Sequence, residues 1–143
     1  MDSLDASATL RWSGFHGRIE GTSGALDVAT ATQAELGGPG GLSNPEELFS
    51  AALANCLTST LTGMARARGV ELGEIETTVS TRLAWGDGSH HHLSEATLHT
   101  TVSSPAPEAQ VRGLIADAEA KCPVCQAIAG RVALRVTADV AAV

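Results

Sequence analysis

The three cysteines, Cys56, Cys122 and Cys125, are the residues of this chain with the clearest chemistry. As thiolates they are nucleophiles and metal ligands, and pairs of them form disulfides. The chain does not open on a basic and then apolar stretch, so we expect no signal peptide. An odd number of cysteines without an export signal favours reduced, reactive or metal-binding thiols over a structural disulfide framework. The sequence therefore predicts a protein of the cytoplasm.

Cys56 and Cys122 each lie on the apolar part of a predicted helix. Both helices should pack on the same sheet, so the two thiols could approach each other. The alternative is that both are simply buried, since free cysteine is among the most buried residue types. A reactive thiol also needs a cation or a helix N-terminus nearby to stabilise its thiolate. The candidate cations are Arg18, Arg66, Arg82 and Lys121.

The segment from Cys122 to Cys125, CPVC, has the CxxC spacing of a redox pair or of half a zinc site. Zinc would need two more ligands, and three consecutive histidines in a loop are more typical of solvated side chains. The histidines available are His90, His91, His92 and His99. Thioredoxin-like chemistry places CxxC at the start of a helix that follows a strand. Here the motif follows a helix, which argues against that chemistry.

The helix that carries Cys56 is predicted over residues 45–68. Asn44 can cap it, Pro45 suits its first position, Glu47 completes a capping box and Gly69 ends it. Residues 48–65 carry no charge, which is typical of a helix buried on all sides. Its many Ser, Thr and Asn residues argue against a membrane span. We therefore expect this helix to form the centre of the fold.

The remaining elements are predicted from alternation and turn residues. Strands are expected over residues 9–13, 18–20, 26–32, 74–85, 93–102 and 131–140. A second helix opens at residues 104–108 and carries an apolar stripe, and Pro123 breaks or restarts it. Cys122 belongs to that stripe and should face the core. The order is βββαββαβ, an α+β fold with antiparallel hairpins, an antiparallel sheet and one domain over residues 1–143.

Composition limits the partners of the chain. The formal charge of −7 argues against binding nucleic acid, because neutralising phosphates requires clustered Lys and Arg. A chain of 143 residues with few aromatic side chains has difficulty covering a long apolar helix by itself. We therefore expect an obligate homodimer that shares its core, with no membrane partner.

Together these motifs resemble the OsmC/Ohr family, the osmotically inducible protein C and organic hydroperoxide resistance proteins. The resemblance covers nearly the whole chain and rests on four segments, which are Gly17-Arg18 before a glycine-rich run, NPEELF from Asn44, ANC at Cys56, and KCPV from Lys121. It implies a thiol-dependent peroxidase with an antioxidant role that forms an intertwined homodimer. The implied substrates are alkyl or lipid hydroperoxides.

The resemblance also assigns roles to residues. It implies that Cys56 is the peroxidatic thiol, that Cys122 is the resolving thiol, that Arg18 activates Cys56, and that Glu46 holds Arg18. Cys56 would become a sulfenic acid, Cys122 would condense with it, and an external dithiol, for which a lipoyl protein is the candidate, would reduce the disulfide. No metal, haem or nucleotide cofactor is expected. Glu46 lies ten residues before Cys56, about 15 Å along a helix, so we expect a site shared between two subunits.

Cys125 departs from the family pattern, which usually has serine at this position. It either replaces that serine as a buried residue or competes with Cys122 as the resolving thiol. A strained disulfide between Cys122 and Cys125 should be easily reduced, so we expect mainly Cys56–Cys122 in the oxidised protein. A second class of function also fits the sequence. In it, the protein binds a small apolar ligand without catalysis, or its thiols act as a redox sensor.

Overall fold

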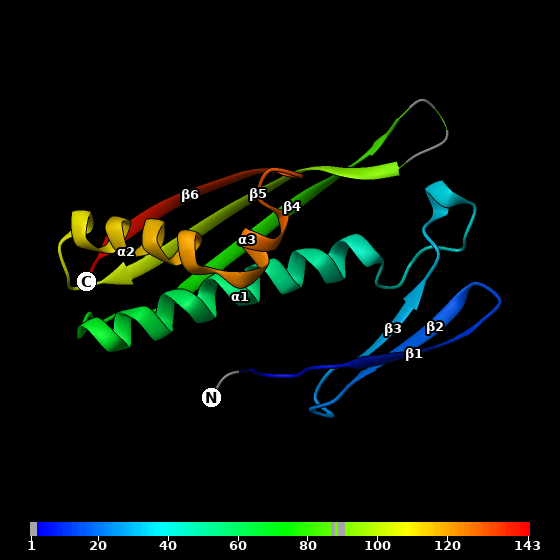
Figure 1. Cartoon of the computed structure of the whole chain (residues 1–143), viewed down its shortest axis with the longest axis horizontal. Coiled ribbons are helices and arrows are strands. Elements are labelled where there is room, and N and C mark those ends of the chain that lie inside the picture. The colour runs from blue at the N-terminus through cyan, green and yellow to red at the C-terminus, as the bar shows by residue number, and fades with distance from the viewer. Residues whose placement is uncertain (1–2, 87, 89–90) are drawn as a thin grey trace. The chain divides into compact units, whose positions relative to one another are not determined.

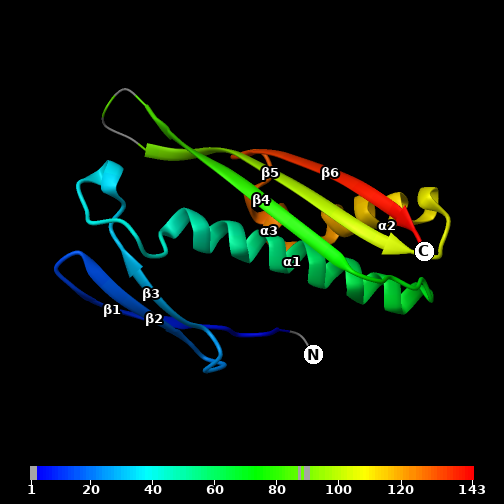
Figure 2. The ribbon, with the colours of Figure 1, turned by 180° about the vertical axis from the view of Figure 1, so that it is seen from behind.

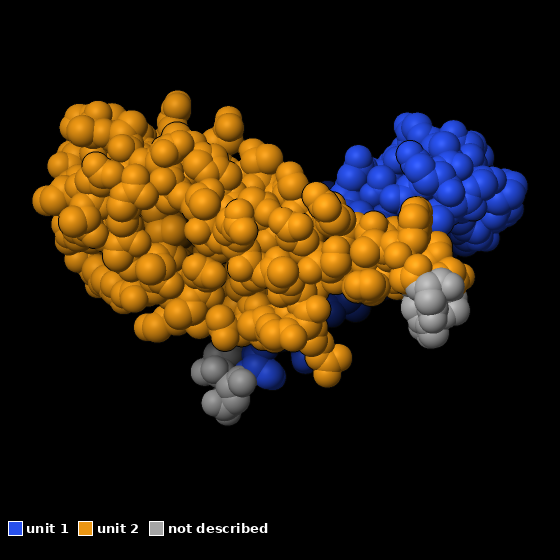
Figure 3. Space-filling model, turned by 90° about the horizontal axis from the view of Figure 1, so that it is seen from above, with its two compact units in different colours: residues 1–48 blue, residues 49–143 orange. Residues whose placement is uncertain are grey.

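A computed structural model describes residues 3–86, 88 and 91–143. The chain forms two compact units, Met1–Leu48 and Phe49–Val143, which are coloured separately in Figure 3. The sequence predicts one domain over residues 1–143, and that stays a prediction.

The first unit is a three-stranded antiparallel sheet. Its strands are β1 (Ala8–Ser13), β2 (His16–Gly21) and β3 (Asp27–Ala31), in the order β1-β2-β3, followed by a short 3-10 helix, η1 (Ala34–Leu36). The register divides the sheet into two faces: Leu10 lies opposite Ile19 on an apolar face, and Arg11 lies opposite Arg18 on a charged face. Alternation along the strands produces this division.

The second unit contains a mixed sheet, β4 (Ile75–Trp85), β5 (His91–Ser104) and β6 (Ala133–Ala142), in the order β4-β5-β6. β4 and β5 form the predicted antiparallel hairpin, whereas β6 runs parallel to β5. The prediction of an antiparallel sheet is therefore wrong at this pair. The physical reason is the crossover formed by α2 (Glu108–Lys121) and α3 (Pro123–Ile128), which returns the chain to the starting end of β5 (Figure 1).

Helix α1 (Pro45–Arg68) has the predicted bounds. Asn44 caps it, since its Oδ1 accepts the backbone N–H of Glu47 at 2.8 Å. It ends where Gly69 adopts φ 66°, a left-handed conformation that favours glycine. By length and composition α1 could also cross a membrane, although only 22% of its apolar window is buried in the chain.

The prediction that α1 is buried on all sides is wrong for the single chain. One stripe along the helix is buried, consisting of Leu53, Leu57, Leu61 and Ala65. The other faces carry small residues such as Ala52, Ser59 and Gly63, which are exposed. The absence of charge identified a helix with little affinity for water, but a sheet of three strands covers only one side of it. Among the described residues, the positions of the helix outside this stripe are exposed or half-buried.

The buried stripe of α1 joins one core with β5 and α2, and α1 and α2 lie on the same side of the β4–β6 sheet (Figures 1 and 2). Hydroxyl groups connect α1 to the sheet across this core. Thr58 of α1 contacts Thr77 of β4 at 2.9 Å, and Thr77 contacts Thr100 of β5 at 2.9 Å. These bonds satisfy polar groups that would otherwise be costly to bury. The polar residues that argue against a membrane span therefore position the helix.

Candidate active site

The CPVC segment forms the junction between α2 and α3. Cys122 ends α2 and is also the N-cap of α3, and Pro123 occupies the first turn of α3. The Cys122 sulfur accepts the backbone N–H of Cys125 at 3.5 Å. CPVC follows α2, as predicted, and the helix restarts at Pro123 as α3, so the motif also opens a helix. Proline at the first position of a helix explains this, since it ends α2 without preventing a new helix from starting.

Cys56 of α1 reaches this junction. Cys56 is half-buried and packs against the core that contains the fully buried Cys122, and the Cys122 thiol raises the pKa of Cys56. The backbone N–H of Val124 and the hydroxyl of Thr60 also lie close enough to Cys56 to lower its pKa as hydrogen-bond donors. The structure thus brings together two cysteines that are 66 residues apart in the sequence (56 to 122). Thr60 lies one helical turn after Cys56, which places its hydroxyl on the same face of α1.

Two of these contacts were not predicted from the sequence. Val124 takes part through its backbone N–H, so its side-chain type carries no signal. Thr60 could have been identified from its i+4 spacing to Cys56, but α1 contains several hydroxyl residues and the spacing alone does not distinguish among them.

Burial raises the pKa of the Cys56 thiol above its ordinary value, and the contact with Cys122 raises it further. The Val124 N–H and the Thr60 hydroxyl act in the opposite direction, because both stabilise the thiolate. Among the described residues, the groups that set this pKa include no Lys or Arg. The single chain therefore holds Cys56 as a thiol with anion-stabilising donors but without an activating cation.

Cys125, three residues after Cys122, is also fully buried. Burial, together with the hydrogen bond to Cys122 and the charges of Cys122, Cys56 and Glu119, raises the pKa of Cys125 to about 12. The three thiols therefore form one cluster, with Cys122 in contact with both of the others. Hereafter this set is called the thiol cluster.

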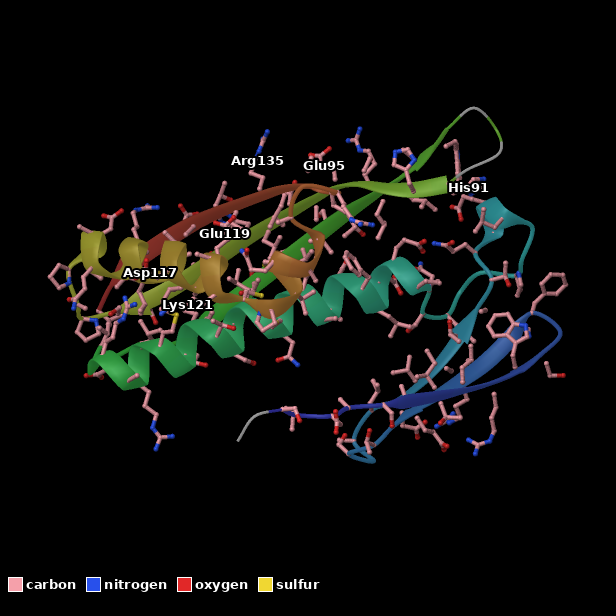
Figure 4. The ribbon with its side chains drawn as sticks, viewed as in Figure 1. His91, Glu95, Asp117, Glu119, Lys121 and Arg135 are labelled. Carbon is pink, nitrogen blue, oxygen red and sulfur yellow. The ribbon has the colours of Figure 1, made fainter. Side chains whose placement is uncertain are left out.

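The four candidate cations have other positions. The Arg18 guanidinium lies 2.7 Å from Asp27 on the charged face of the first sheet, and this contact raises its pKa. Arg82 lies 3.8 Å from Glu95. Arg66 is exposed in the last turn of α1, and Lys121, which is labelled in Figure 4, is exposed in the last turn of α2.

Glu46 lies in the first turn of α1, where its carboxylate accepts a hydrogen bond from the Gln33 side chain at 2.7 Å. In the first unit, Arg18 is thus paired with Asp27 and Glu46 with Gln33. The implied contact between Arg18 and Glu46 is not formed in this unit. The roles of both residues at Cys56 remain predictions, because Cys56 belongs to the second unit.

The first unit contains an apolar cavity of about 440 Å³ over the apolar face of its sheet. Residues that line it include Leu10, Trp12, Ile19, Leu36 and Leu48. Arg18 extends from the opposite, charged face, since the register pairs it with Arg11 and not with Leu10. The cavity walls are thus made mainly by aliphatic and aromatic groups.

In the described part of the chain, no group of three or more His, Cys, Asp or Glu side chains is arranged to hold a metal ion. His91 and His92 belong to β5 and are exposed, so the expectation that they lie in a loop is wrong. The β4–β5 pairing extends further than the alternation of the sequence indicated, because His91 pairs with Trp85. His90 lies outside the described residues.

A family model described as OsmC-like protein matches residues 38–137, a span that contains both Cys56 and the CPVC segment. This chain belongs to the OsmC-like family. The predicted resemblance is therefore confirmed. No match was found among curated proteins.

Solved structures agree with the family. An organic hydroperoxide resistance protein OsmC of Legionella pneumophila is 29% identical, with a TM-score of 0.82, over 95% of this chain and 97% of that one. An organic hydroperoxide resistance protein of Elizabethkingia anophelis is 25% identical, with a TM-score of 0.81, over 99% and 100%. The fold of OhrB of Bacillus subtilis is also similar, at 24% identity and a TM-score of 0.74 over 95% and 98%. These matches confirm the predicted α+β class of this OsmC-like chain.

Proposed function

We propose that this protein is a thiol-dependent peroxidase that reduces organic hydroperoxides, with Cys56 as the peroxidatic and Cys122 as the resolving thiol. The observation that carries the proposal is that Cys56 packs against the core that contains Cys122, a cysteine of a different helix, closely enough for Cys122 to raise the pKa of Cys56. A disulfide needs two sulfurs that approach closely, with Cα atoms within about 7 Å of each other. Two similar proteins are named organic hydroperoxide resistance proteins, which agrees with this reaction.

In the first step the Cys56 thiolate attacks the terminal oxygen of a hydroperoxide. The O–O bond breaks, the alkoxide leaves and takes a proton to become an alcohol, and Cys56 becomes a sulfenic acid. The Val124 N–H and the Thr60 hydroxyl donate to the thiolate before the attack. Both donors stabilise the reactive ionisation state of the sulfur without a metal or an organic cofactor.

In the second step the Cys122 sulfur attacks the sulfenic sulfur. A Cys56–Cys122 disulfide forms and water leaves. An external dithiol, for which a lipoyl protein is our candidate, then reduces the disulfide by thiol exchange. Because Cys56 is half-buried and Cys122 is fully buried, the Cys56 sulfur is the accessible point of attack. A reducing compartment, the cytoplasm, belongs to this proposal.

We propose that the cation that stabilises the Cys56 thiolate comes from the partner subunit of a dimer. Arg18 is the candidate, and its ion pair with Asp27 is solvent-exposed, so exchanging it for a thiolate costs about 1 kcal/mol or less. Glu46 would hold Arg18 once Gln33 releases it. α1 is regular from its first turn, and ten helical residues span about 15 Å, so one chain's Glu46 cannot steady a cation at its own Cys56 by direct contact. We therefore propose a site shared between two subunits.

The experiment is a thiol titration before and after one equivalent of cumene hydroperoxide, with disulfide mapping. The expected result is the loss of two thiols, with Cys56–Cys122 as the first disulfide that forms. Cys56→Ser should abolish turnover while keeping the fold, because a hydroxyl of similar volume is a far weaker nucleophile. A Cys56→Ser protein that retained a tenth of the activity would show that the assignment is wrong.

A second candidate function is a binder of small apolar ligands whose thiols are bystanders or sensors. The apolar cavity of the first unit and the raised pKa of Cys56 favour it. The titration distinguishes the two functions, since a ligand binder would not lose thiols at a rate that depends on hydroperoxide concentration.

A further inference from the structure

Cys125 is a buried thiol that the proposed peroxidase cycle does not use. It is not an isolated cysteine, because it shares Cys122 with Cys56 in the thiol cluster. Its backbone N–H donates to the Cys122 sulfur at 3.5 Å, and both residues are fully buried. Cys122 can therefore form a disulfide on either of two sides, and the chemistry of the cluster depends on which side holds the bond.

We propose that Cys125 is a second resolving thiol, which takes over the disulfide from Cys56 and leaves it between Cys122 and Cys125. This inference rests on the proposed peroxidase function. In the added step the Cys125 thiolate attacks the Cys122 sulfur of the Cys56–Cys122 disulfide. The Cys122–Cys125 bond forms, the Cys56–Cys122 bond breaks, and Cys56 leaves as a thiolate. The proton lost by Cys125 remains for Cys56, so the exchange needs no oxidant or reductant.

The geometry of the junction supports this exchange. Cys122 is the N-cap of α3 and Cys125 is the third residue after it, in the same turn. Side chains three residues apart on a helical turn lie about 5–6 Å apart at Cβ, and a disulfide requires slightly less, so a small adjustment closes the bond. Cys56 belongs to a different helix, so its distance from Cys122 depends on how α1 packs. Cys125 is tied to Cys122 by the chain itself.

The ionisation of the three thiols gives the exchange its direction. At equilibrium a disulfide favours the more basic sulfurs and leaves the less basic thiol free. Burial raises the pKa of Cys125 to about 12. The groups that face Cys125 contribute to this shift, and they are Cys122 at the junction, Cys56 of α1 and Glu119 of α2. Burial raises the pKa of Cys56 as well, but the Val124 N–H and the Thr60 hydroxyl lower it in part, and Cys125 has no such donors among the described groups that set its pKa. Cys56 is therefore the better leaving group.

The exchange has a functional consequence. It returns Cys56 to the thiol form while the first oxidising equivalent stays stored in a fully buried disulfide. A second hydroperoxide can then oxidise Cys56 again. Because Cys122 is already bonded, the resulting sulfenic acid has no resolving partner within the cluster and persists. The protein would thus record a second oxidation as a stable sulfenic acid at Cys56.

The experiment is a stepwise titration of the reduced full-length protein with cumene hydroperoxide, to one and then two equivalents. Peptide mapping locates the disulfide and a dimedone-type probe counts sulfenic acid. The wild-type protein should consume about two equivalents and show a Cys122–Cys125 disulfide with a labelled Cys56. Cys125→Ser should consume about one equivalent, keep Cys56–Cys122 and show at least tenfold less label. Cys125→Ala provides the same comparison if the serine variant does not fold.

The outcomes separate this inference from the peroxidase proposal. A wild-type protein that stops after one equivalent with Cys56–Cys122, as the Cys125 variants do, overturns the inference and leaves the peroxidase intact. A Cys56–Cys125 disulfide overturns the inference as well. A wild-type protein that consumes no hydroperoxide overturns both.

Discussion

At the scale of single residues, the ionisation of Cys56 is a balance between burial and two local donors. Burial disfavours the thiolate, whereas the Val124 N–H and the Thr60 hydroxyl favour it. A backbone donor cannot be removed by a side-chain substitution. The Thr60 hydroxyl can be removed by substitution, so a variant at Thr60 tests this balance.

Thr60→Val should raise the pKa of Cys56 further, because the thiolate loses a hydrogen bond and the neutral thiol loses little. A hydrogen bond to a charged group contributes about 1.5 kcal/mol, so alkylation of Cys56 at neutral pH should slow by up to about tenfold. The pH profile should shift upward, since a higher pH is then needed to form the same fraction of thiolate. Site-specific mass spectrometry of Cys56 after iodoacetamide treatment measures the rate.

The matched control is Thr62→Val on the same helix. The Thr62 hydroxyl donates to the Ser59 carbonyl at 3.0 Å and the residue is exposed. Equal rates for the two variants would mean that Thr60 does not stabilise the thiolate.

At the scale of elements, α1 positions Cys56 because one of its stripes packs on the second sheet. Leu57 follows Cys56 directly, is 1% exposed and belongs to the core shared with β5 and α2. Hydroxyl contacts such as Thr58 to Thr77 fix the helix against the same sheet. The distance between Cys56 and Cys122 thus depends on how Leu57 and Thr58, the residues that follow Cys56, pack on the sheet.

Leu57→Ala should lower the free energy of unfolding by about 2–5 kcal/mol, because it leaves a cavity under α1. Urea denaturation followed by circular dichroism measures this change. The control is Leu4→Ala, the same substitution at a residue that is 85% exposed, which should change stability by less than about 0.5 kcal/mol. Similar losses for both variants would contradict the proposed packing of the stripe.

At the scale of the whole molecule, one feature of α1 is not explained by a single chain. Eighteen consecutive uncharged residues cover every side of the helix from Leu48 to Ala65, yet only one stripe is buried. The exposed remainder consists of small residues that allow another helix to approach closely, in agreement with the predicted homodimer.

Sedimentation velocity at low micromolar concentration should show a dimer. Ser59→Arg on the exposed side of α1 should shift it toward monomer, because a charge would be buried without a partner. Ala109→Arg, on an exposed position of α2, is the control and should remain dimeric. A stable wild-type monomer would refute the homodimer.

A shared site also predicts complementation. Mixed dimers of Cys56→Ser and Arg18→Ala subunits should recover part of the wild-type peroxidase activity, because one of their two sites keeps both residues. Homodimers of either variant should lack it. Mixed dimers that are as inactive as the parents would favour a site built within one chain.

Much of this protein follows from local sequence. The bounds of α1 are determined by Asn44 and Gly69, and the inward and outward faces of β4 to β6 by alternation, since both depend only on neighbouring residues. The motifs around Cys56 and Cys122 identified the family. These signals are local, so they do not require knowledge of the packing.

Other features were decided only by the tertiary structure. The parallel pairing of β6 with β5 depends on where the α2–α3 crossover ends, and alternation is the same in either direction. The approach of Cys56 to Cys122 requires α1 and the α2–α3 junction to pack on one sheet. The donor that Val124 supplies is a backbone group that every residue except proline carries, and only the fold aims it at a sulfur. Long-range contacts of this kind leave no pattern in the residues that make them.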